Sequence, residues 1–237
     1  MFFVFDGIDG SGKSTQLNLF VEWLTAAGHE VVSCKDPGST ELGERLRSIL
    51  LEVSAPPMPI DNHTEMMLFT TARTQLVYEV VRPALAAGKT VVLDRYLFST
   101  VVYQGHAGDL DRETIWTINR LATGGLMPNA TFLFDLPVEV AVQRMQGRDG
   151  QNFDRMESRG QSYFERVRQG FLSEADRWPG QAFVIDANRS AELIQQHVRQ
   201  LAQQCFADIA SAPSLASPAV SAESTAPLNP IDAEKSQ

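Results

Sequence analysis

The chain has 237 residues, a length that suits one large α/β domain and is short for two. Its 20 Lys and Arg residues are outnumbered by 29 Asp and Glu residues, and the net charge of −9 has the wrong sign for a protein that coats nucleic acid. Two cysteines are too few for a disulfide framework, and no apolar run approaches the roughly 18 residues of a membrane span, which predicts a cytoplasmic protein without a membrane partner.

The first elements of the chain surround a glycine-rich loop. Residues 2–5 form an apolar run typical of a buried strand, and residues 13–27 carry apolar side chains at helical spacing. The loop between them fits the phosphate-loop pattern G-x-x-x-x-G-K-[ST] at every fixed position. Its backbone N–H groups and the following helix N-terminus favour a polyanion. The predicted nucleotide-binding residues are Gly7, Ile8, Asp9, Gly10, Ser11, Gly12, Lys13, Ser14 and Thr15.

Two residues of this loop have expected chemical roles. Lys13 should reach the β- and γ-phosphates of a bound nucleotide, and the Ser14 hydroxyl should coordinate the Mg²⁺ that bridges them. A chance glycine-rich turn is the alternative, and the order of strand, loop and helix disfavours it. Asp94 closes a later buried strand and is the second expected Mg²⁺ ligand, while Arg95 beside it can bind a phosphate with two N–H groups. A surface Asp–Arg pair is the alternative there.

The rest of the chain alternates short apolar strands with helices. This order predicts an α/β phosphate-loop (P-loop) NTPase fold, with a five-stranded parallel sheet covered by helices on both faces. Residues 1–209 form the predicted domain, and the Ser-, Ala- and Pro-rich residues 210–237 are predicted to be a disordered tail. Further strands are expected at residues 31–35, 90–94, 130–136 and 182–186, and further helices at residues 41–51, 64–87, 114–122, 138–145, 162–178 and 191–207.

Residues 94–105, Asp-Arg-Tyr-Leu-Phe-Ser-Thr-Val-Val-Tyr-Gln-Gly, resemble the corresponding segment of thymidylate kinases. Residues 5–15, 68–73 and 154–157 also agree with that family in order and spacing. The resemblance implies transfer of the ATP γ-phosphate to dTMP, which gives dTDP for dTTP synthesis. It further implies Mg²⁺ as cofactor, dTMP and ATP as substrates, and a homodimer formed through helices.

The resemblance assigns residues to a thymidylate pocket. Phe69 matches an aromatic that stacks on thymine, and Arg73, four residues later on the same helix face, matches an arginine that bonds a base carbonyl. Core packing is the alternative for Phe69. Arg47 and Arg95 match arginines that hold the acceptor phosphate. The other residues that match substrate-binding positions are Asp9, Asp36, Ser99, Thr100, Tyr103 and Gln104.

The resemblance is not complete around Asp36. Lys-Asp-Pro-Gly-Ser-Thr at residues 35–40 stands where the family usually has Arg-Glu-Pro-Gly-Gly-Thr, and Asp6 stands where Glu is usual. Each carboxylate is therefore one methylene shorter than its usual counterpart. Lys35 also lacks the planar fork of an arginine.

A polar, arginine-rich stretch suits a lid at about residues 145–160. Some thymidylate kinases carry a catalytic arginine in the phosphate loop and others carry it in the lid. This loop has no arginine, so Arg148 or Arg155 is the expected catalytic arginine, with a surface charge as the alternative for Arg148. Lys13, Arg95 and Asp9 complete the expected catalytic residues.

Two other functions compete with this prediction. A deoxynucleoside kinase would also bind ATP, but Arg47 and Arg95 suit an acceptor that is already phosphorylated. A nucleotide-binding switch would not need Phe69 and Arg73, and no Asn-Lys-x-Asp run for reading guanine occurs.

Overall fold

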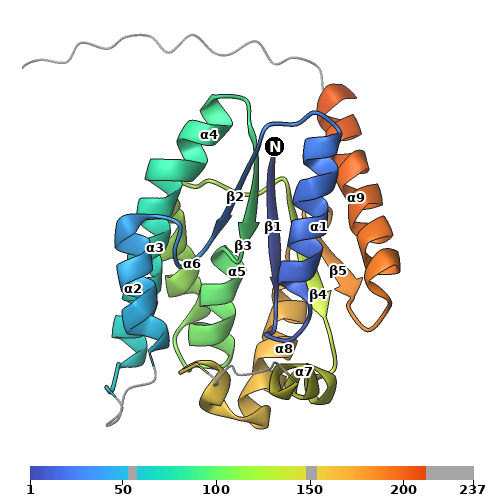
Figure 1. Ribbon diagram of the computed structural model, residues 1–237. Coiled ribbons are helices and arrows are strands. Elements are labelled where there is room, and N and C mark those ends of the chain that lie inside the picture. Colours follow the sequence, from blue (N-terminus) through green and yellow to red (C-terminus); the bar gives the residue numbers. More distant parts are fainter. Residues whose placement is uncertain (53–57, 148–153, 212–237) are drawn as a thin grey trace, which may run out of the picture.

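The computed structural model describes residues 1–52, 58–147 and 154–211 (Figure 1). These residues form a five-stranded sheet in the order β2-β3-β1-β4-β5, with every neighbouring pair parallel. The predicted fold class is confirmed. The strands are β1 Phe2–Gly7, β2 Val31–Lys35, β3 Thr90–Asp94, β4 Ala130–Asp135 and β5 Ala182–Asp186.

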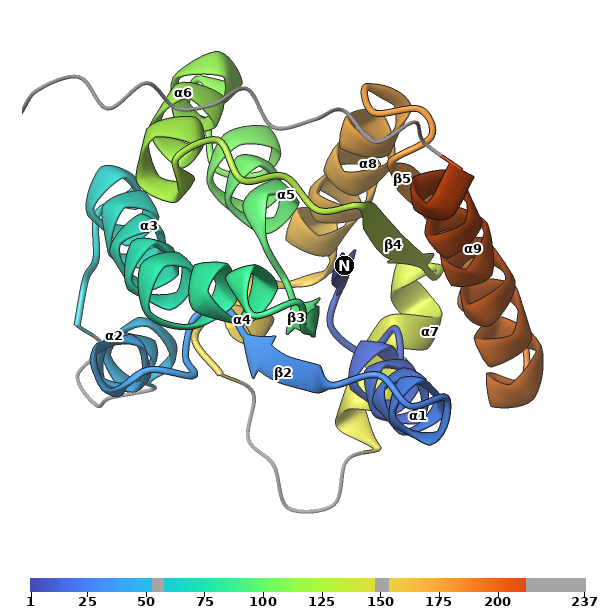
Figure 2. The same ribbon diagram turned by 90° about the horizontal axis from the view of Figure 1, so that it is seen from above.

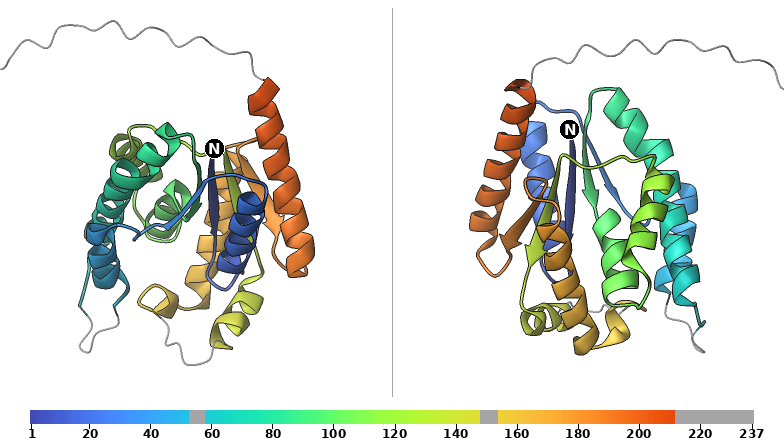
Figure 3. Two further views of the ribbon diagram at one scale, coloured as in Figure 1. Left: turned by 45° about the horizontal axis from the view of Figure 1, so that its top comes forward. Right: turned by 180° about the vertical axis from the view of Figure 1, so that it is seen from behind.

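Helices cover both faces of the sheet. Viewed from above, α1 and α9 lie on one face, whereas α3, α4, α5 and α8 lie on the other (Figure 2). Helix α2 packs against α3, outside the layer that covers the sheet (Figure 3). The helices are α1 Lys13–Ala26, α2 Glu41–Leu51, α3 Asn62–Leu76, η1 Val77–Val81, α4 Arg82–Ala86, α5 Leu97–Thr100, η2 Val101–His106, α6 Arg112–Thr123, α7 Val138–Gln146, η3 Glu157–Arg159, α8 Gln161–Asp176 and α9 Ala191–Ser211. In the described residues no helix is both long and apolar enough to span a bilayer.

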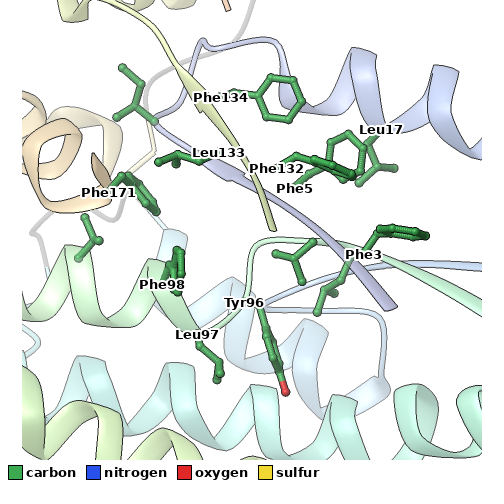
Figure 4. Packing of buried hydrophobic residues seen from close by; sticks show 14 of the residues in the cluster. Phe3, Phe5, Leu17, Tyr96, Leu97, Phe98, Phe132, Leu133, Phe134 and Phe171 are labelled. Carbon is green, nitrogen blue, oxygen red and sulfur yellow. The ribbon is translucent and has the colours of Figure 1, made fainter. Parts of the chain in front are cut away.

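Aromatic side chains fill the layer between the sheet and α1. Phe3 stacks on Phe132 with ring centroids 5.9 Å apart, and Phe5 stacks on Phe134 at 5.5 Å (Figure 4). Because side chains alternate along a strand, the neighbouring residues of β1 face the opposite side of the sheet. There Asp6 meets α5, where its carboxylate accepts a hydrogen bond from Ser99.

Several element boundaries differ from the prediction by a few residues, and some short helices were missed. The predicted helix over residues 64–87 begins earlier, after the N-cap Asp61, and runs through α3, the π-helical turn η1 and α4. Helices α5 and η2 were not predicted, because their buried residues leave no apolar stripe and their Val-Val-Tyr run favours a strand. Helix α9 continues to Ser211, two residues past the predicted domain boundary of 209, since its last turns contain the good helix formers Ala207 and Ala210. The rest of the predicted tail lies outside the described residues.

The carboxyl ends of the three strands β2, β3 and β1 meet at one edge of the sheet. In the register, Phe5 pairs with Asp94, and Lys35 also pairs with Asp94. The loop after β1, the turn after β2 and the segment after β3 therefore converge. Ligands of open α/β sheets bind at this edge.

Candidate functional site

The loop after β1 is shaped by glycines whose backbone angles other residues rarely adopt. Gly7, Gly10 and Gly12 all have positive φ angles, of 131°, 79° and 88°. A Cβ at Gly7 would lie 2.5 Å from the carbonyl oxygen of Phe134, and one at Gly10 would collide with the carbonyl oxygen of Ala141. The loop therefore lies directly against the backbone of β4 and α7, and α1 begins where the loop ends.

Lys13 is folded back over this loop. Its side chain is only 6% exposed, and its Nζ donates to the carbonyl oxygens of Gly7 at 3.0 Å and Ile8 at 2.8 Å. Burial and the nearby Arg95 lower the pKa of Lys13 to about 8, despite the opposing attraction of Asp9. The ammonium is thus a buried cation that donates its hydrogen bonds to neutral carbonyl oxygens, which a phosphate can replace, while the Asp9 carboxylate lies 3.9 Å away.

An open cleft of about 540 Å³, here called the loop cleft, lies in front of this lysine. Most of the predicted loop residues line it, whereas Gly7, Ile8 and Ser11 lie behind them, with the Ser11 hydroxyl donating to the Ile8 carbonyl. Four charged residues that were not predicted as site residues also line the cleft. The residues that line it are Asp9, Gly10, Gly12, Lys13, Ser14, Thr15, Lys35, Asp36, Arg47, Asp94, Arg95, Arg144, Asp154 and Glu157.

The predicted metal ligands fit Mg²⁺ by the chemistry of their oxygens. Ser14 is exposed on the wall of the loop cleft. Asp94 lines the same cleft, and its Oδ1 is buried with no hydrogen-bond partner among the described residues. A buried carboxylate oxygen without a partner is costly, and hard oxygen ligands are the ones that Mg²⁺ takes.

Arg95 is held by several partners within the site. Its backbone φ of 67° is unusual for a residue other than glycine, and such strain clusters at functional sites. Its Nη2 donates to Asp9 at 2.5 Å and its Nη1 to the Gly7 carbonyl at 2.9 Å, with the guanidinium 5.3 Å from the ring centre of Tyr103. Burial alone would raise the pKa of Asp9, but Arg95 and Lys13 lower it to about 2. Asp9 therefore carries a charge that keeps Arg95 in place.

A second, smaller cavity of about 90 Å³, here called the inner cavity, opens beside the loop cleft. All the predicted substrate-binding residues line it. Phe69 is half-buried, as a ring on a cavity wall should be, so core packing does not account for its position. The lining residues are Asp9, Asp36, Pro37, Arg47, Leu51, Phe69, Arg73, Arg95, Ser99, Thr100, Tyr103, Gln104, Asp154 and Met156.

The wall of the inner cavity contains a fixed arginine. Arg73 donates from Nε to Asp36 at 2.5 Å and from Nη1 to Asn119 at 2.8 Å. Burial raises the pKa of Asp36, and Arg73 opposes that rise. Asn119 was not predicted, although it stands with Ile115 on the buried stripe of α6, where a polar residue could have been noticed.

Of the two expected lid arginines the structure describes only Arg155, which is not brought to the loop cleft. Arg148 lies outside the described residues. Arg155 pairs with the buried carboxylate of Glu65 at 2.5 Å, donates to the Leu50 carbonyl at 2.7 Å, and lines neither cavity. The same Glu65 accepts a hydrogen bond from Gln104, so Arg155 is held behind the wall of the inner cavity. A local pattern of arginines could not reveal this partner.

The two cavities share part of their walls. Arg47, Arg95, Asp9, Asp36 and Asp154 line both. Two guanidinium groups thus lie where a chain of phosphates in the loop cleft would meet an anionic group carried by a flat molecule in the inner cavity. This arrangement can align two phosphates for a transfer between them.

Comparison with known proteins gives one consistent result. The model of the thymidylate kinase family matches residues 5–198. A thymidylate kinase of Kosmotoga olearia is 44% identical over 198 residues, which cover 84% of this chain and 93% of that protein. One of Rhodopirellula baltica is 43% identical over 193 residues, covering 81% of this chain and 76% of the relative. The crystal structure of thymidylate kinase from Ehrlichia chaffeensis matches with a TM-score of 0.68 and 28% identity, over 86% of this chain and 98% of that one.

Proposed function

Because this chain belongs to the thymidylate kinase family, whose members phosphorylate dTMP to dTDP with ATP, we propose that its own reaction takes place where the loop cleft meets the inner cavity. The observation that carries the proposal is that Arg47 and Arg95 line both spaces. ATP occupies the loop cleft, dTMP occupies the inner cavity, and the two reacting phosphates meet at these arginines.

The donor side holds the polyphosphate. Lys13 exchanges the Gly7 and Ile8 carbonyls for the β- and γ-phosphates, and the loop amides bind the remaining oxygens. Ser14 and Asp94 are the residues that would hold Mg²⁺, which when bound neutralises charge on the β- and γ-phosphate oxygens.

The acceptor side holds the nucleotide by its ring and its phosphate. Phe69 offers a flat apolar surface for thymine, and Arg73 offers N–H donors for a base carbonyl. Ser99, Thr100 and Gln104 complete the base pocket, while Tyr103 lies beside the sugar and disfavours a ribose 2′-hydroxyl.

The transfer needs no covalent intermediate. A phosphate oxygen of the acceptor is already a competent nucleophile, so no protein base is required, and positioning and charge neutralisation supply the catalysis. Asp9 faces the acceptor sugar and phosphate and fixes Arg95. Arg148 or Arg155 is proposed to neutralise the transferring phosphoryl group, and Arg155 would exchange Glu65 for it.

The experiment that tests the function is ADP release from ATP and Mg²⁺ with separate acceptors. Strong release with dTMP, weak release with dUMP and none with thymidine would support the proposal. Equal release with thymidine would show that no acceptor phosphate is needed and would place the chain with the deoxynucleoside kinases. If no acceptor gave ADP release, only nucleotide binding would remain, as in a nucleotide-binding switch.

The pH dependence of the reaction should follow Lys13. Its pKa of about 8 lies below the ordinary 10.5, so the ammonium loses its proton, and with it the attraction for phosphate, as the pH rises through about 8. We expect kcat/KM for ATP, which reports ionisations of the free enzyme, to fall by about tenfold per pH unit above that value. A flat profile up to about pH 10, the ordinary range of lysine, would contradict this. Circular dichroism over the same range checks that the fold persists.

Replacement of Asp94 by asparagine should weaken the use of Mg²⁺. The change removes the charge of a carboxylate whose Oδ1 has no hydrogen-bond partner in the described part of the chain. We expect the Mg²⁺ concentration for half-maximal activity to rise by about tenfold or more, the usual range for a disturbed metal site. Asp135, which closes β4 and pairs with Arg168 at 2.7 Å, provides the matched control D135N, with unchanged Mg²⁺ dependence. Equal effects of both variants would contradict the role of Asp94.

We further propose a homodimer that forms through α3 and α6, which pack side by side. Leu121 of α6 is 82% exposed, Met67 of α3 is 51% exposed, and Tyr78 of η1, which continues α3, is 53% exposed. Large apolar side chains exposed on neighbouring helices suit a protein interface. Light scattering should give the mass of a dimer for the protein and of a monomer for Leu121→Glu.

We also propose a reducing, cytoplasmic location, with which the free thiols of Cys34 and Cys205 agree.

A further inference from the structure

Asn119 lies behind the inner cavity, not on its wall. We propose that it is a positioning residue that acts through Arg73. It sets the preference of the inner cavity for a base with a carbonyl, rather than an amino group, at the ring position that faces Arg73. The proposal rests on the function proposed above, because it concerns the base of the acceptor nucleotide.

The first step is that Arg73 has little freedom. Its side chain is 2% exposed, and its Nε and Nη1 are both engaged, by Asp36 and Asn119. The guanidinium group also lies 5.7 Å from the ring centre of Tyr96. Two hydrogen bonds on different nitrogens of a planar group fix both its plane and its rotation within that plane.

The second step is that Asn119 can impose this orientation. It is fully buried on α6, and α6 packs against both α3, which carries Arg73, and α5. Its Oδ1 accepts from Arg73, while its Nδ2 points to the Leu97 carbonyl at 3.4 Å. An amide held between a donor and an acceptor has one favourable orientation, and that orientation presents an oxygen to Arg73.

The third step concerns what the fixed guanidinium presents to a ligand. Arginine has only donors, and with Nε and one N–H of Nη1 engaged, the donors that remain have set directions. A carbonyl oxygen satisfies such a donor, whereas an amino group in the same place would set donor against donor. Sites built around a directed buried hydrogen bond discriminate strongly, because the wrong ligand leaves a buried group unpaired. Asn119 therefore favours thymine or uracil over cytosine without contacting the base itself.

The test compares Asn119→Leu with the unaltered enzyme on dTMP and dCMP. Leucine keeps the branched shape of the side chain, with a somewhat larger volume, and removes the oxygen that Arg73 binds. We expect KM for dTMP to rise by about tenfold or more, the usual effect of losing a hydrogen bond to a charged group, and the dTMP:dCMP ratio of kcat/KM to fall by a similar factor. KM for ATP should stay within about twofold, because Arg73, through which Asn119 acts, lines the inner cavity and not the loop cleft.

Two further variants separate positioning from general stability. Asn119→Asp keeps an acceptor oxygen for Arg73, so it should restore KM for dTMP to within about threefold of the unaltered enzyme. Thr123→Val removes another fully buried polar group of α6, whose hydroxyl donates to the backbone carbonyl of Asn119 and also interacts with the Tyr96 side chain but makes no hydrogen bond to the Arg73 guanidinium in the described part of the chain. It should lower the unfolding temperature without changing either KM or the dTMP:dCMP ratio.

Three results would overturn the inference. They are a folded Asn119→Leu with unchanged selectivity, an Asn119→Asp as impaired as Asn119→Leu, or a Thr123→Val that loses selectivity equally. Should Asn119→Leu not fold, Asn119→Ala, which also removes the oxygen that Arg73 binds, takes its place in each comparison. An unaltered enzyme that does not phosphorylate dTMP would instead refute the proposed function, so the two failures are distinguishable.

Discussion

Replacement of Lys13 by methionine is expected to lower kcat by at least about a hundredfold, the usual cost of removing one preorganised donor from a site that stabilises developing charge. The ammonium is buried and close to the loop carbonyls that phosphates would replace. Methionine has a similar length and no charge. KM for dTMP should change little, because Lys13 does not line the inner cavity. Steady-state kinetics with each substrate varied in turn measures both quantities.

The control for Lys13 is Lys89→Met. Lys89 pairs with the exposed Glu30 at 3.2 Å and precedes β3, at the opposite end of that strand from the site. Its replacement should leave kcat unchanged. If the two methionine variants had the same kcat, the donor role of Lys13 would be wrong.

Replacement of Arg95 by methionine is expected to lower kcat/KM for dTMP by about a thousandfold, since two charge-assisted hydrogen bonds to a phosphate contribute about 2 kcal/mol each. The change should also destabilise the fold. Asp6 is fully buried and Asp9 keeps a low pKa through Arg95, and removal of one partner of a buried ion pair costs about 3 to 5 kcal/mol. Arg95→Lys keeps the charge without the planar fork, so it should lose less kcat/KM for dTMP and less stability than Arg95→Met.

The control for Arg95 is Arg168→Met. Arg168 makes two hydrogen bonds to Asp135, at 2.7 and 2.9 Å, and also lies near the end of a sheet strand, but it lines neither cavity. Its loss should lower stability and leave KM for dTMP unchanged. If the Arg95→Met enzyme had a normal KM for dTMP, Arg95 would not bind the acceptor, whatever the stability of the variant. Chemical unfolding and steady-state kinetics separate the two effects.

The parts of the site that the sequence predicted are those whose chemistry is local. The phosphate loop is a contiguous motif between a strand and a helix, so its position at the sheet edge followed from order alone. Asp94 and Arg95 were predicted for the same reason, because a charged pair at the end of a buried strand must lie at the carboxyl edge of the sheet.

The parts that could not be predicted depend on partners far along the chain. Arg73 and Asn119 are separated by 46 positions, and no periodicity relates them. Glu65 bonds Arg159, 94 positions away, and also pairs with Arg155, so the arginine-rich pattern indicated a lid residue without indicating the carboxylate that holds it. Phe69 shares a helical stripe with Leu76, which favours a core position, and only the tertiary packing places it beside a cavity.

The central place of β1 in the sheet has a consequence for how the protein folds. Phe3 is paired with Val92 on one side and with Ala130 on the other, so the strand that leads into the phosphate loop finds both neighbours only after a large part of the chain has been made. Pairings so distant in sequence form slowly, since the loop-closure entropy is lost before the contacts are gained. The phosphate loop, although it is the clearest motif in the sequence, therefore acquires its binding-competent conformation late in folding. During refolding, we expect tight ATP binding to emerge with the completed sheet rather than with the first helices.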